Sequence, residues 1–190
     1  MIAVIGKTCV GKTTFLNYLK NKGFSIFILD EFVNDLYEKS EKFYTFILNN
    51  LGEKYCINNK IDKLKIRTLF NQKPEIIDLL EKGIYPLIFE HFQSYSYDFV
   101  EIPNLVNQKN DFSSFFSSIL CLETSNKIRM KNAQKRNVDK LFIQEIDRKN
   151  DPKTIKNLLF GKIPIVDIYA NNFTDIEKMQ KIFQLLLPII

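Results

Sequence analysis

The chain has 190 residues, of which 45% are apolar and 26% are charged, and its formal net charge is +5. This length favours one domain with a sizeable core, and no apolar run approaches the roughly 18 residues that a membrane span needs. The three cysteines, Cys9, Cys56 and Cys121, lack the spacing of a disulfide framework or a zinc site. No basic run with interleaved stacking aromatics occurs, so we expect no nucleic-acid partner, and the lack of a spanning segment predicts no membrane partner.

The first predicted element is a short buried strand, Ile2–Ile5, which leaves no room for a targeting segment before it. We therefore expect a cytoplasmic protein. We also expect a monomer or a weak oligomer. Residues 6–13 follow and fit the pattern G-x-x-x-x-G-K-[ST] of loops that bind nucleoside triphosphates. A predicted helix comes next, with Phe15, Leu16 and Leu19 on one face. This order of strand, loop and helix favours a binding site over a mere glycine turn.

The chemistry of the loop follows from its backbone. Gly6 and Gly11 let the chain curl so that successive N–H groups face an anion, and the helix start adds its positive dipole end. The pattern predicts that Lys12 reaches the β- and γ-phosphates and that the Thr13 hydroxyl binds Mg²⁺. Cys9 is interpreted as a spacer of the loop rather than a reactive thiol. The predicted nucleotide-binding residues here are Gly6, Lys7, Thr8, Cys9, Val10, Gly11, Lys12, Thr13 and Thr14.

The second predicted strand, residues 26–29, is followed directly by Asp30. Ligands of open α/β sheets gather beyond the carboxyl ends of the strands, so we expect Asp30 to lie close to the γ-phosphate. A carboxylate there can accept a proton from a substrate hydroxyl or help to hold Mg²⁺. The alternative is that Asp30 only caps a helix that begins at Phe32.

The remaining strand candidates, residues 98–102, 118–122 and 163–168, alternate with helical stretches. This pattern predicts an α/β fold of three layers, with a central parallel sheet of about five strands. Two long helical segments interrupt the alternation. We predict a single domain over residues 1–190, with a core of residues 1–29, 98–123 and 161–190, a helical insert of residues 30–97 that binds the substrate, and a helical lid of residues 124–160.

The predicted lid is rich in basic residues. Arg129, Asn132 and Arg136 lie three and four positions apart, so they share one face of a helix. Arginines of a lid can stabilise charge on a phosphoryl group during its transfer. A solvated basic face is the alternative interpretation of the same residues.

Taken together, these motifs resemble those of the dephospho-CoA kinases, a family of P-loop kinases. Asp30 stands in the place of the second Asp of the family's D-x-D, and residues 61–70 resemble its signature of basic residues followed by Leu-Arg and Phe. Residues 85–88, Tyr-Pro-Leu-Ile, resemble its His-Pro-Leu-Ile, and residues 100–105 resemble its strand that ends in Pro-Leu-Leu. Residues 136–137 stand near its lid Arg-Asp.

The resemblance implies phosphorylation of the ribose 3′-hydroxyl of dephospho-CoA by ATP with Mg²⁺. It implies that Asp30 is the catalytic base and that Lys12, Arg129 and Arg136 neutralise the phosphates. Lys63 and Arg67 would bind the phosphates of the acceptor. Two further roles are implied: Tyr85 would contact the acceptor, and Asn171 would lie near the adenine.

The chain also departs from the family pattern. Ile28 replaces the first Asp of D-x-D, Tyr85 replaces the His, and Asn132 stands where the upstream lid arginine would fall. Three alternative functions stay open: another small-molecule P-loop kinase acting on a nucleoside, nucleotide or sugar, a nucleotide-binding switch protein, and an RNA-binding protein, which the net charge of +5 would suit. Residues 59–62 fit the guanine-reading pattern N-K-x-D formally, but they lie in the helical insert rather than after a strand of the sheet.

Overall fold

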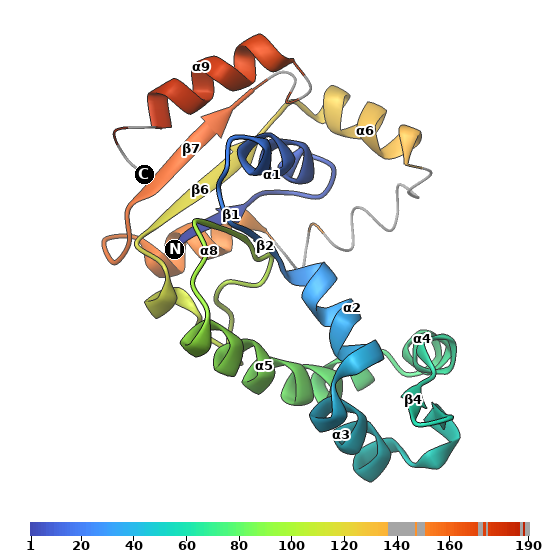
Figure 1. Cartoon of the computed structure of the whole chain (residues 1–190). Helices are drawn as coiled ribbons and strands as arrows, with labels where there is room; N and C mark the ends of the chain where they lie inside the picture. Colours follow the sequence, from blue (N-terminus) through green and yellow to red (C-terminus); the bar gives the residue numbers. More distant parts are fainter. Residues whose placement is uncertain (137–146, 148–150, 171–172, 174, 187, 189–190) are drawn as a thin grey trace. The chain divides into compact units, whose positions relative to one another are not determined.

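The computed structural model describes residues 1–136, 147, 151–170, 173, 175–186 and 188. The chain divides into two compact units (Figure 1). Residues 1–28 and 97–190 form the first, here called the phosphate-loop unit, and residues 29–96 form the second, here called the helical unit. The helical unit begins and ends one residue earlier than the insert predicted from the sequence.

A five-stranded sheet forms the centre of the phosphate-loop unit. Its strands are β1 (Ile2–Ile5), β2 (Ile26–Ile28), β5 (Phe99–Glu101), β6 (Ser118–Glu123) and β7 (Ile165–Tyr169). Their order is β2-β5-β1-β6-β7, and every neighbouring pair is parallel. The predicted parallel sheet of about five strands is therefore confirmed, with bounds within two residues of those expected. Because β1 lies in the middle, the loop that follows it emerges at the centre of the carboxyl edge.

Helices cover both faces of this sheet (Figure 1). On one face α1 (Lys12–Asn21) and α9 (Ile176–Leu186) pack their apolar side chains against alternate residues of the strands. On the other face α8 (Pro152–Leu159) places Lys156 against Asp167 of β7. The unit is completed by the short turn η2 (Ser113–Phe115) and by α6 (Asn126–Lys135). These three layers confirm the predicted fold class.

The helical unit has its own core. Its helices are α2 (Leu29–Lys39), α3 (Glu41–Leu51), α4 (Lys63–Gln72) and α5 (Ile76–Ser94), with a short turn η1 (Glu53–Tyr55). The buried residues of this core are Leu36, Phe43, Ile47, Ile61, Ile66 and Leu80. None of the helices described in either unit combines the length and apolar character required to cross a lipid bilayer.

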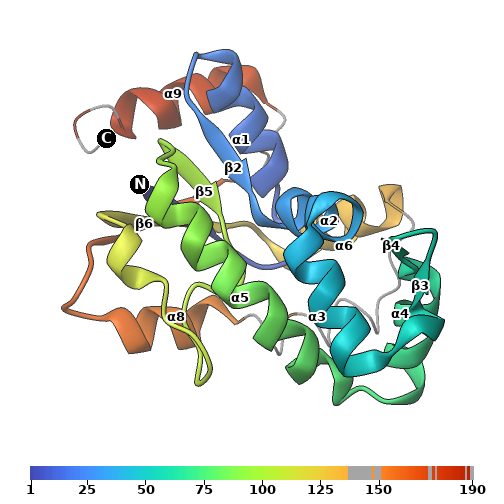
Figure 2. The same ribbon diagram turned by 60° about the horizontal axis from the view of Figure 1, so that its bottom comes forward.

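The helical unit also contains a hairpin that the sequence analysis did not predict. Strands β3 (Cys56–Ile57) and β4 (Lys60–Ile61) pair antiparallel beside α4, as Figure 2 shows. The two turn residues, Asn58 and Asn59, have φ values of 50° and 60°. Asparagine tolerates this left-handed conformation, and two such residues in succession favour a tight hairpin turn. The sequence pattern predicted a mostly helical segment without a strand here, and the absence of a strand is the part of that expectation that was wrong.

The hairpin also explains the formal N-K-x-D match at residues 59–62. The Asp62 carboxylate accepts the N–H groups of Leu64 and Lys65, both at 3.1 Å, and so caps the start of α4. A carboxylate used as a helix cap satisfies donors that would otherwise stay unpaired. This observation favours a structural role for the motif over guanine recognition.

Candidate functional site

The loop between β1 and α1, residues 6–11, depends on its two glycines. Gly6 has a φ of 149°, and a Cβ atom there would lie 2.5 Å from the carbonyl oxygen of Leu122. Gly11 has a φ of 112°, and its Cβ would lie 3.0 Å from atoms of Phe173. Cys9 is left-handed too, with a φ of 62°. Residues of this handedness within a tight turn let consecutive N–H groups converge, which is the geometry of an anion site.

Lys12 is the first residue of α1, and its ammonium lies inside the loop. Nζ donates to the carbonyl oxygens of Gly6 at 2.9 Å and Lys7 at 3.3 Å. It also lies 3.7 Å from Oε1 of Glu101, and the two side chains are only 11% and 12% exposed. The loop therefore carries a buried positive charge next to its own N–H groups. Gly11, the N-cap of α1, has no side chain with which to cap the N–H groups of the first turn.

Glu101 is a site residue that the sequence analysis missed. It ends β5, the strand that lies directly between β1 and β2 in the sheet. The available signal was an acidic residue at the carboxyl end of a parallel strand, the same signal that selected Asp30. Without the strand order, the sequence could not show which acid ends the strand next to the loop.

Asp30 lies in the helical unit, in the first turn of α2, and is exposed. Strand β2 ends at Ile28 and the helix begins at Leu29, three residues before the expected start at Phe32. Asp30 is therefore helical and does not close the strand as predicted. Its role as a base stays a prediction.

The first helix of the predicted lid, α6, contacts the loop from outside. Arg129 is 5% exposed, donates from Nε to the Thr8 carbonyl oxygen at 3.0 Å and forms an ion pair with Asp147. Asn132 donates from Nδ2 to the Cys9 carbonyl oxygen at 3.0 Å. Arg136 follows the last residue of α6, is exposed, and has no side-chain partner among the residues that the structure describes. The predicted pair of lid arginines is thus divided between a buried and an exposed position.

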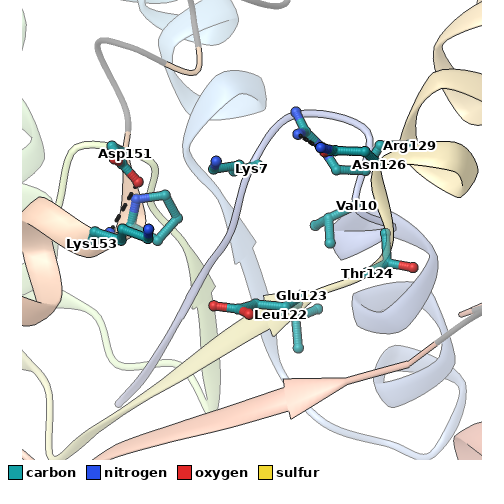
Figure 3. Close-up of a pocket in the computed structure, with 10 residues that line it drawn as sticks. Lys7, Val10, Leu122, Glu123, Thr124, Asn126, Arg129, Asp151 and Lys153 are labelled. Carbon is teal, nitrogen blue, oxygen red and sulfur yellow. Dashed lines mark hydrogen bonds between the residues drawn. The ribbon is translucent and has the colours of Figure 1, made fainter.

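A pocket of about 150 Å³ lies next to the loop (Figure 3). The loop contributes Lys7 and Val10, β6 contributes Leu122 and Glu123, and the first turns of α6 and α8 supply most of the remaining wall. Lys7 and Lys153 have no ion-pair partner among the described residues, so the pocket has positive charge available for an anion.

Beside this pocket, Cys121, Glu123 and Asp167 bring donor atoms within 4.8 Å of one another, a grouping that could hold a metal ion. Lys156 already pairs with both carboxylates, at 2.9 Å to Glu123 and 2.5 Å to Asp167. Burial disfavours the charged Lys156, yet these hydrogen bonds raise its pKa overall. Burial raises the pKa of the Cys121 thiol to about 12, so it stays protonated at neutral pH. The cluster is therefore an ion-pair network rather than a metal site.

The predicted substrate residues lie in the helical unit. Lys63 and Arg67 are one turn apart on α4 and line a pocket of about 300 Å³, whose apolar wall includes Phe70 and Leu80. Lys63 donates to Glu38 at 2.7 Å. Arg67 has no side-chain partner among the described residues. Tyr85 lies in the middle of α5 and does not line this pocket.

Two of the residues singled out from the sequence, Asn137 and Asn171, lie outside the described residues. The predicted contact of Asn171 with the adenine therefore stays a prediction. The predicted loop residues 6–14 all lie together, between the end of β1 and the first turn of α1.

No protein-family model matches the chain. It is 26% identical over 193 residues to a dephospho-CoA kinase of Mycoplasma genitalium, covering 98% of this chain and 91% of that protein. A dephospho-CoA kinase of Rickettsia typhi is 29% identical over 187 residues, covering 95% and 92%. The solved dephospho-CoA kinase from Campylobacter jejuni shares the fold with a TM-score of 0.57 at 19% identity, covering 96% of this chain and 94% of that one. The resemblance predicted from the motifs is thus confirmed over nearly the full length.

Proposed function

We propose that this chain, a divergent member of the dephospho-CoA kinase family, phosphorylates the ribose 3′-hydroxyl of dephospho-CoA with ATP. The products are CoA and ADP, and the reaction is the last step of coenzyme A biosynthesis. The single observation that carries the proposal is the buried Lys12 ammonium within a left-handed glycine loop at the centre of the sheet. The relatives that cover 98% and 95% of the chain are both named dephospho-CoA kinase, which supports the proposal.

In this proposal the loop of residues 6–13 binds the triphosphate of ATP. Its N–H groups and the uncapped start of α1 provide hydrogen-bond donors that need no rearrangement. Lys12 donates to phosphate oxygens in exchange for the carbonyl oxygens of Gly6 and Lys7. Because Glu101 lies 3.7 Å from Nζ, it keeps the ammonium oriented toward the loop during this exchange.

The residues present fit a magnesium ion. Thr13 carries a hydroxyl in the first turn of α1, and Glu101 carries a carboxylate near Lys12. Oxygen ligands of these two kinds suit Mg²⁺, which usually keeps several of its own waters. When bound, the ion neutralises charge on the β- and γ-phosphates. Thr13 would hold it directly, and Glu101 would hold its waters.

For the phosphoryl transfer itself, we propose that Asp30 acts as the base and that Arg136 stabilises charge. The Asp30 carboxylate orients the acceptor hydroxyl and takes its proton as the bond to phosphorus forms. Arg136, which is exposed and without a partner among the described side chains, is the arginine available to stabilise charge on the transferring group. Arg129 serves the same phosphates less directly, because its guanidinium binds the loop.

The pocket of the helical unit is proposed to bind the acceptor. Dephospho-CoA combines phosphate groups with an arm that carries methyl and methylene groups, and the pocket combines an apolar wall with two cations among its lining residues. Arg67 is the stronger candidate for the phosphates, because Glu38 already neutralises Lys63. Guanidinium groups bind phosphate in a bidentate way that a single ammonium cannot match. A contact of Tyr85 with the acceptor belongs to the same proposal.

The test is a reaction of the purified protein with dephospho-CoA and either Mg²⁺-ATP or Mg²⁺-GTP. The product is analysed by mass spectrometry before and after treatment with a nucleotidase specific for 3′-phosphates. We expect a product that is heavier by one phosphoryl group, which the nucleotidase removes, and no product with Lys12→Met. Nucleosides, nucleotides and sugars serve as competing acceptors. Phosphorylation of one of these instead of dephospho-CoA would refute the proposal. A cytoplasmic enzyme that is a monomer or a weak oligomer, without a nucleic-acid partner, is part of the same expectation.

A further inference from the structure

We propose that Arg129, Asn132 and Asp147 form a clamp that holds the phosphate loop in its binding conformation. Arg129 and Asn132 lie three positions apart on α6 and bind two successive carbonyl oxygens of the loop, those of Thr8 and Cys9, each at 3.0 Å. Asp147 accepts the Thr8 N–H at 3.3 Å and pairs with Arg129. The inference rests on the proposed function, because it concerns how the same loop comes to bind a triphosphate.

The direction of these bonds determines where the N–H groups of the loop point. In a trans peptide the C=O and the N–H point in opposite directions. Arg129 holds the Thr8 carbonyl outward, so the N–H of Cys9 points to the opposite side, and no described residue accepts it. The next peptide joins Cys9 and Val10. Its carbonyl oxygen accepts a hydrogen bond from Asn132, and its N–H, that of Val10, donates to the Lys7 carbonyl oxygen at 3.3 Å. The clamp thus leaves the Cys9 N–H available for an anion.

The loop needs such support because Cys9 is strained. Its φ of 62° lies in the left-handed region, which is unfavourable for residues other than glycine. The Cys9 side chain is buried against Met130 and Ala133 of α6, on either side of Asn132 along that helix. One helix therefore fixes both the carbonyl and the side chain of the strained residue.

Burial makes the Arg129 interactions specific. Its side chain is 6% exposed, and that of Asp147 is 17% exposed. The guanidinium serves three partners at once, because Nη1 also donates to Asn126 at 3.2 Å. A planar group with several fixed donors can satisfy this arrangement, and a single ammonium cannot. Arg129 is therefore a positioning residue of the loop, and its identity as arginine matters.

Asn132→Leu is the sharpest test, with Asn17→Leu as its matched control. Asn17 is exposed on α1 and takes no part in the hydrogen bonds of the clamp. We expect Asn132→Leu to raise both the Kd and the KM for ATP about tenfold, the loss expected for one positioned hydrogen bond, with the KM for the acceptor unchanged. We also expect faster alkylation of the Cys9 thiol, read at that residue by mass spectrometry. Asn17→Leu should change none of these values.

Alkylation of Cys9 needs neither ATP nor an acceptor, so it separates the clamp from the proposed function. If wild-type protein fails to phosphorylate dephospho-CoA but Asn132→Leu still accelerates alkylation, the function is wrong and the clamp stands. If Asn132→Leu matches Asn17→Leu in ATP affinity and alkylation, the clamp is refuted. Should the Leu variant not fold, Asn132→Asp, which loses the donor and keeps the shape, replaces it. Arg129→Lys should recover less than a third of the ATP affinity lost in Arg129→Met, and full recovery would also refute the clamp.

Discussion

The two units of the chain hold their candidate site cations, Lys12 and Lys63, in different ways. In the phosphate-loop unit the Lys12 side chain is 11% exposed and bonds to backbone carbonyls of its own loop. In the helical unit the Lys63 side chain is 39% exposed and pairs with Glu38, which is 58% exposed. Buried charges in fixed geometry act at full strength, whereas exposed pairs are screened by water and salt.

This difference suggests a division of labour. A group that must meet a developing charge is most effective when it is already in place before the substrate arrives. A group that recognises a large, flexible acceptor can exchange one weak partner for another at little cost. We therefore expect substitutions in the phosphate-loop unit to affect nucleotide binding and catalysis, and substitutions in the pocket of the helical unit to affect mainly acceptor affinity.

Asp30→Asn should have the largest effect on activity. It tests the proposed difference between the units, because Asp30 belongs to the helical unit and yet should affect catalysis rather than acceptor affinity. Loss of a positioned base should lower kcat by about 10²–10⁴-fold. The Kd for ATP should stay within about twofold of the wild-type value, since asparagine keeps the shape of the side chain. Rapid-quench kinetics and calorimetry would measure the two quantities. An unchanged kcat would remove Asp30 from the mechanism.

Lys12→Met should follow, and it should lower both ATP affinity and turnover. Removing one preorganised donor to a developing charge costs about 10²–10³-fold in rate. Lys12→Met also removes the Nζ hydrogen bonds to the Gly6 and Lys7 carbonyls, so the apo loop should become less ordered. Steady-state kinetics and hydrogen exchange of the loop amides would test both expectations. ATP binding at the wild-type level would contradict the assignment of the loop.

Gly6→Ala should reduce stability more than Gly161→Ala, its matched control. Both glycines have a positive φ, but a Cβ on Gly6 would lie 2.5 Å from the Leu122 carbonyl oxygen, whereas one on Gly161 meets nothing within 4 Å. Backbone strain alone predicts about 1 kcal/mol for Gly161→Ala, and the added overlap predicts about 2–4 kcal/mol for Gly6→Ala. Urea unfolding would measure both. Equal losses would show that the close approach to Leu122 relaxes without cost.

These expectations also show what the sequence could reveal. Residues 6–13 are contiguous, so their spacing alone predicted the loop, and apolar runs bounded by turn residues predicted the five parallel strands to within two residues. The β3–β4 hairpin escaped prediction because two residues per strand are too few to show an alternating pattern. Its Asn58-Asn59 turn was the only local signal.

The missed parts of the candidate site come from distant positions. Glu101, Asn132 and Asp147 contact the loop only because the fold brings residues about 90 to 140 positions away to it. The sequence favoured Asp30 because it directly follows a strand, but the strand order places β5 and its Glu101 next to β1. The sequence placed Asn132 on the same helical face as Arg129 and noted it as a departure from an arginine, but no single-sequence pattern indicates that its amide reaches Cys9.

Arg67→Gln and Lys63→Gln should separate the two cations of the acceptor pocket. Arg67 has no partner among the described side chains, so its loss should raise the KM for the acceptor about tenfold, as for one charge-assisted hydrogen bond. Lys63 must first break its ion pair with Glu38 to bind a phosphate, so Lys63→Gln should raise the KM for the acceptor only about two- to threefold. The KM for ATP should stay unchanged in both. Initial rates at saturating ATP would show the order, and a larger effect of Lys63→Gln would reverse our assignment.

Ser25→Ala should have the smallest effect, which is on stability. Its target, the exposed Asp98 carboxylate of the phosphate-loop unit, can be compared with the exposed Glu38 carboxylate of the helical unit. Hydrogen bonds from the Ser25 hydroxyl and N–H, at 2.6 and 2.7 Å, lower the pKa of Asp98 from 3.8, as the Lys63 hydrogen bond lowers that of Glu38.

Because the folded pKa of Asp98 is depressed, its stabilisation is present above the unfolded pKa and is lost as the pH falls through the folded value. Ser25→Ala should therefore cost at most about 1 kcal/mol at pH 7. The cost should be smaller below about pH 3, where the variant still lacks the hydrogen bond from the Asp98 N–H to Ser25 Oγ, and it should persist in high salt because Ser25 is neutral. Lys63→Gln should lose its effect on stability in high salt at any pH. Urea unfolding at two pH values and two salt concentrations distinguishes the cases, and a salt-sensitive Ser25→Ala would show that charge rather than hydrogen bonding stabilises this end of the sheet.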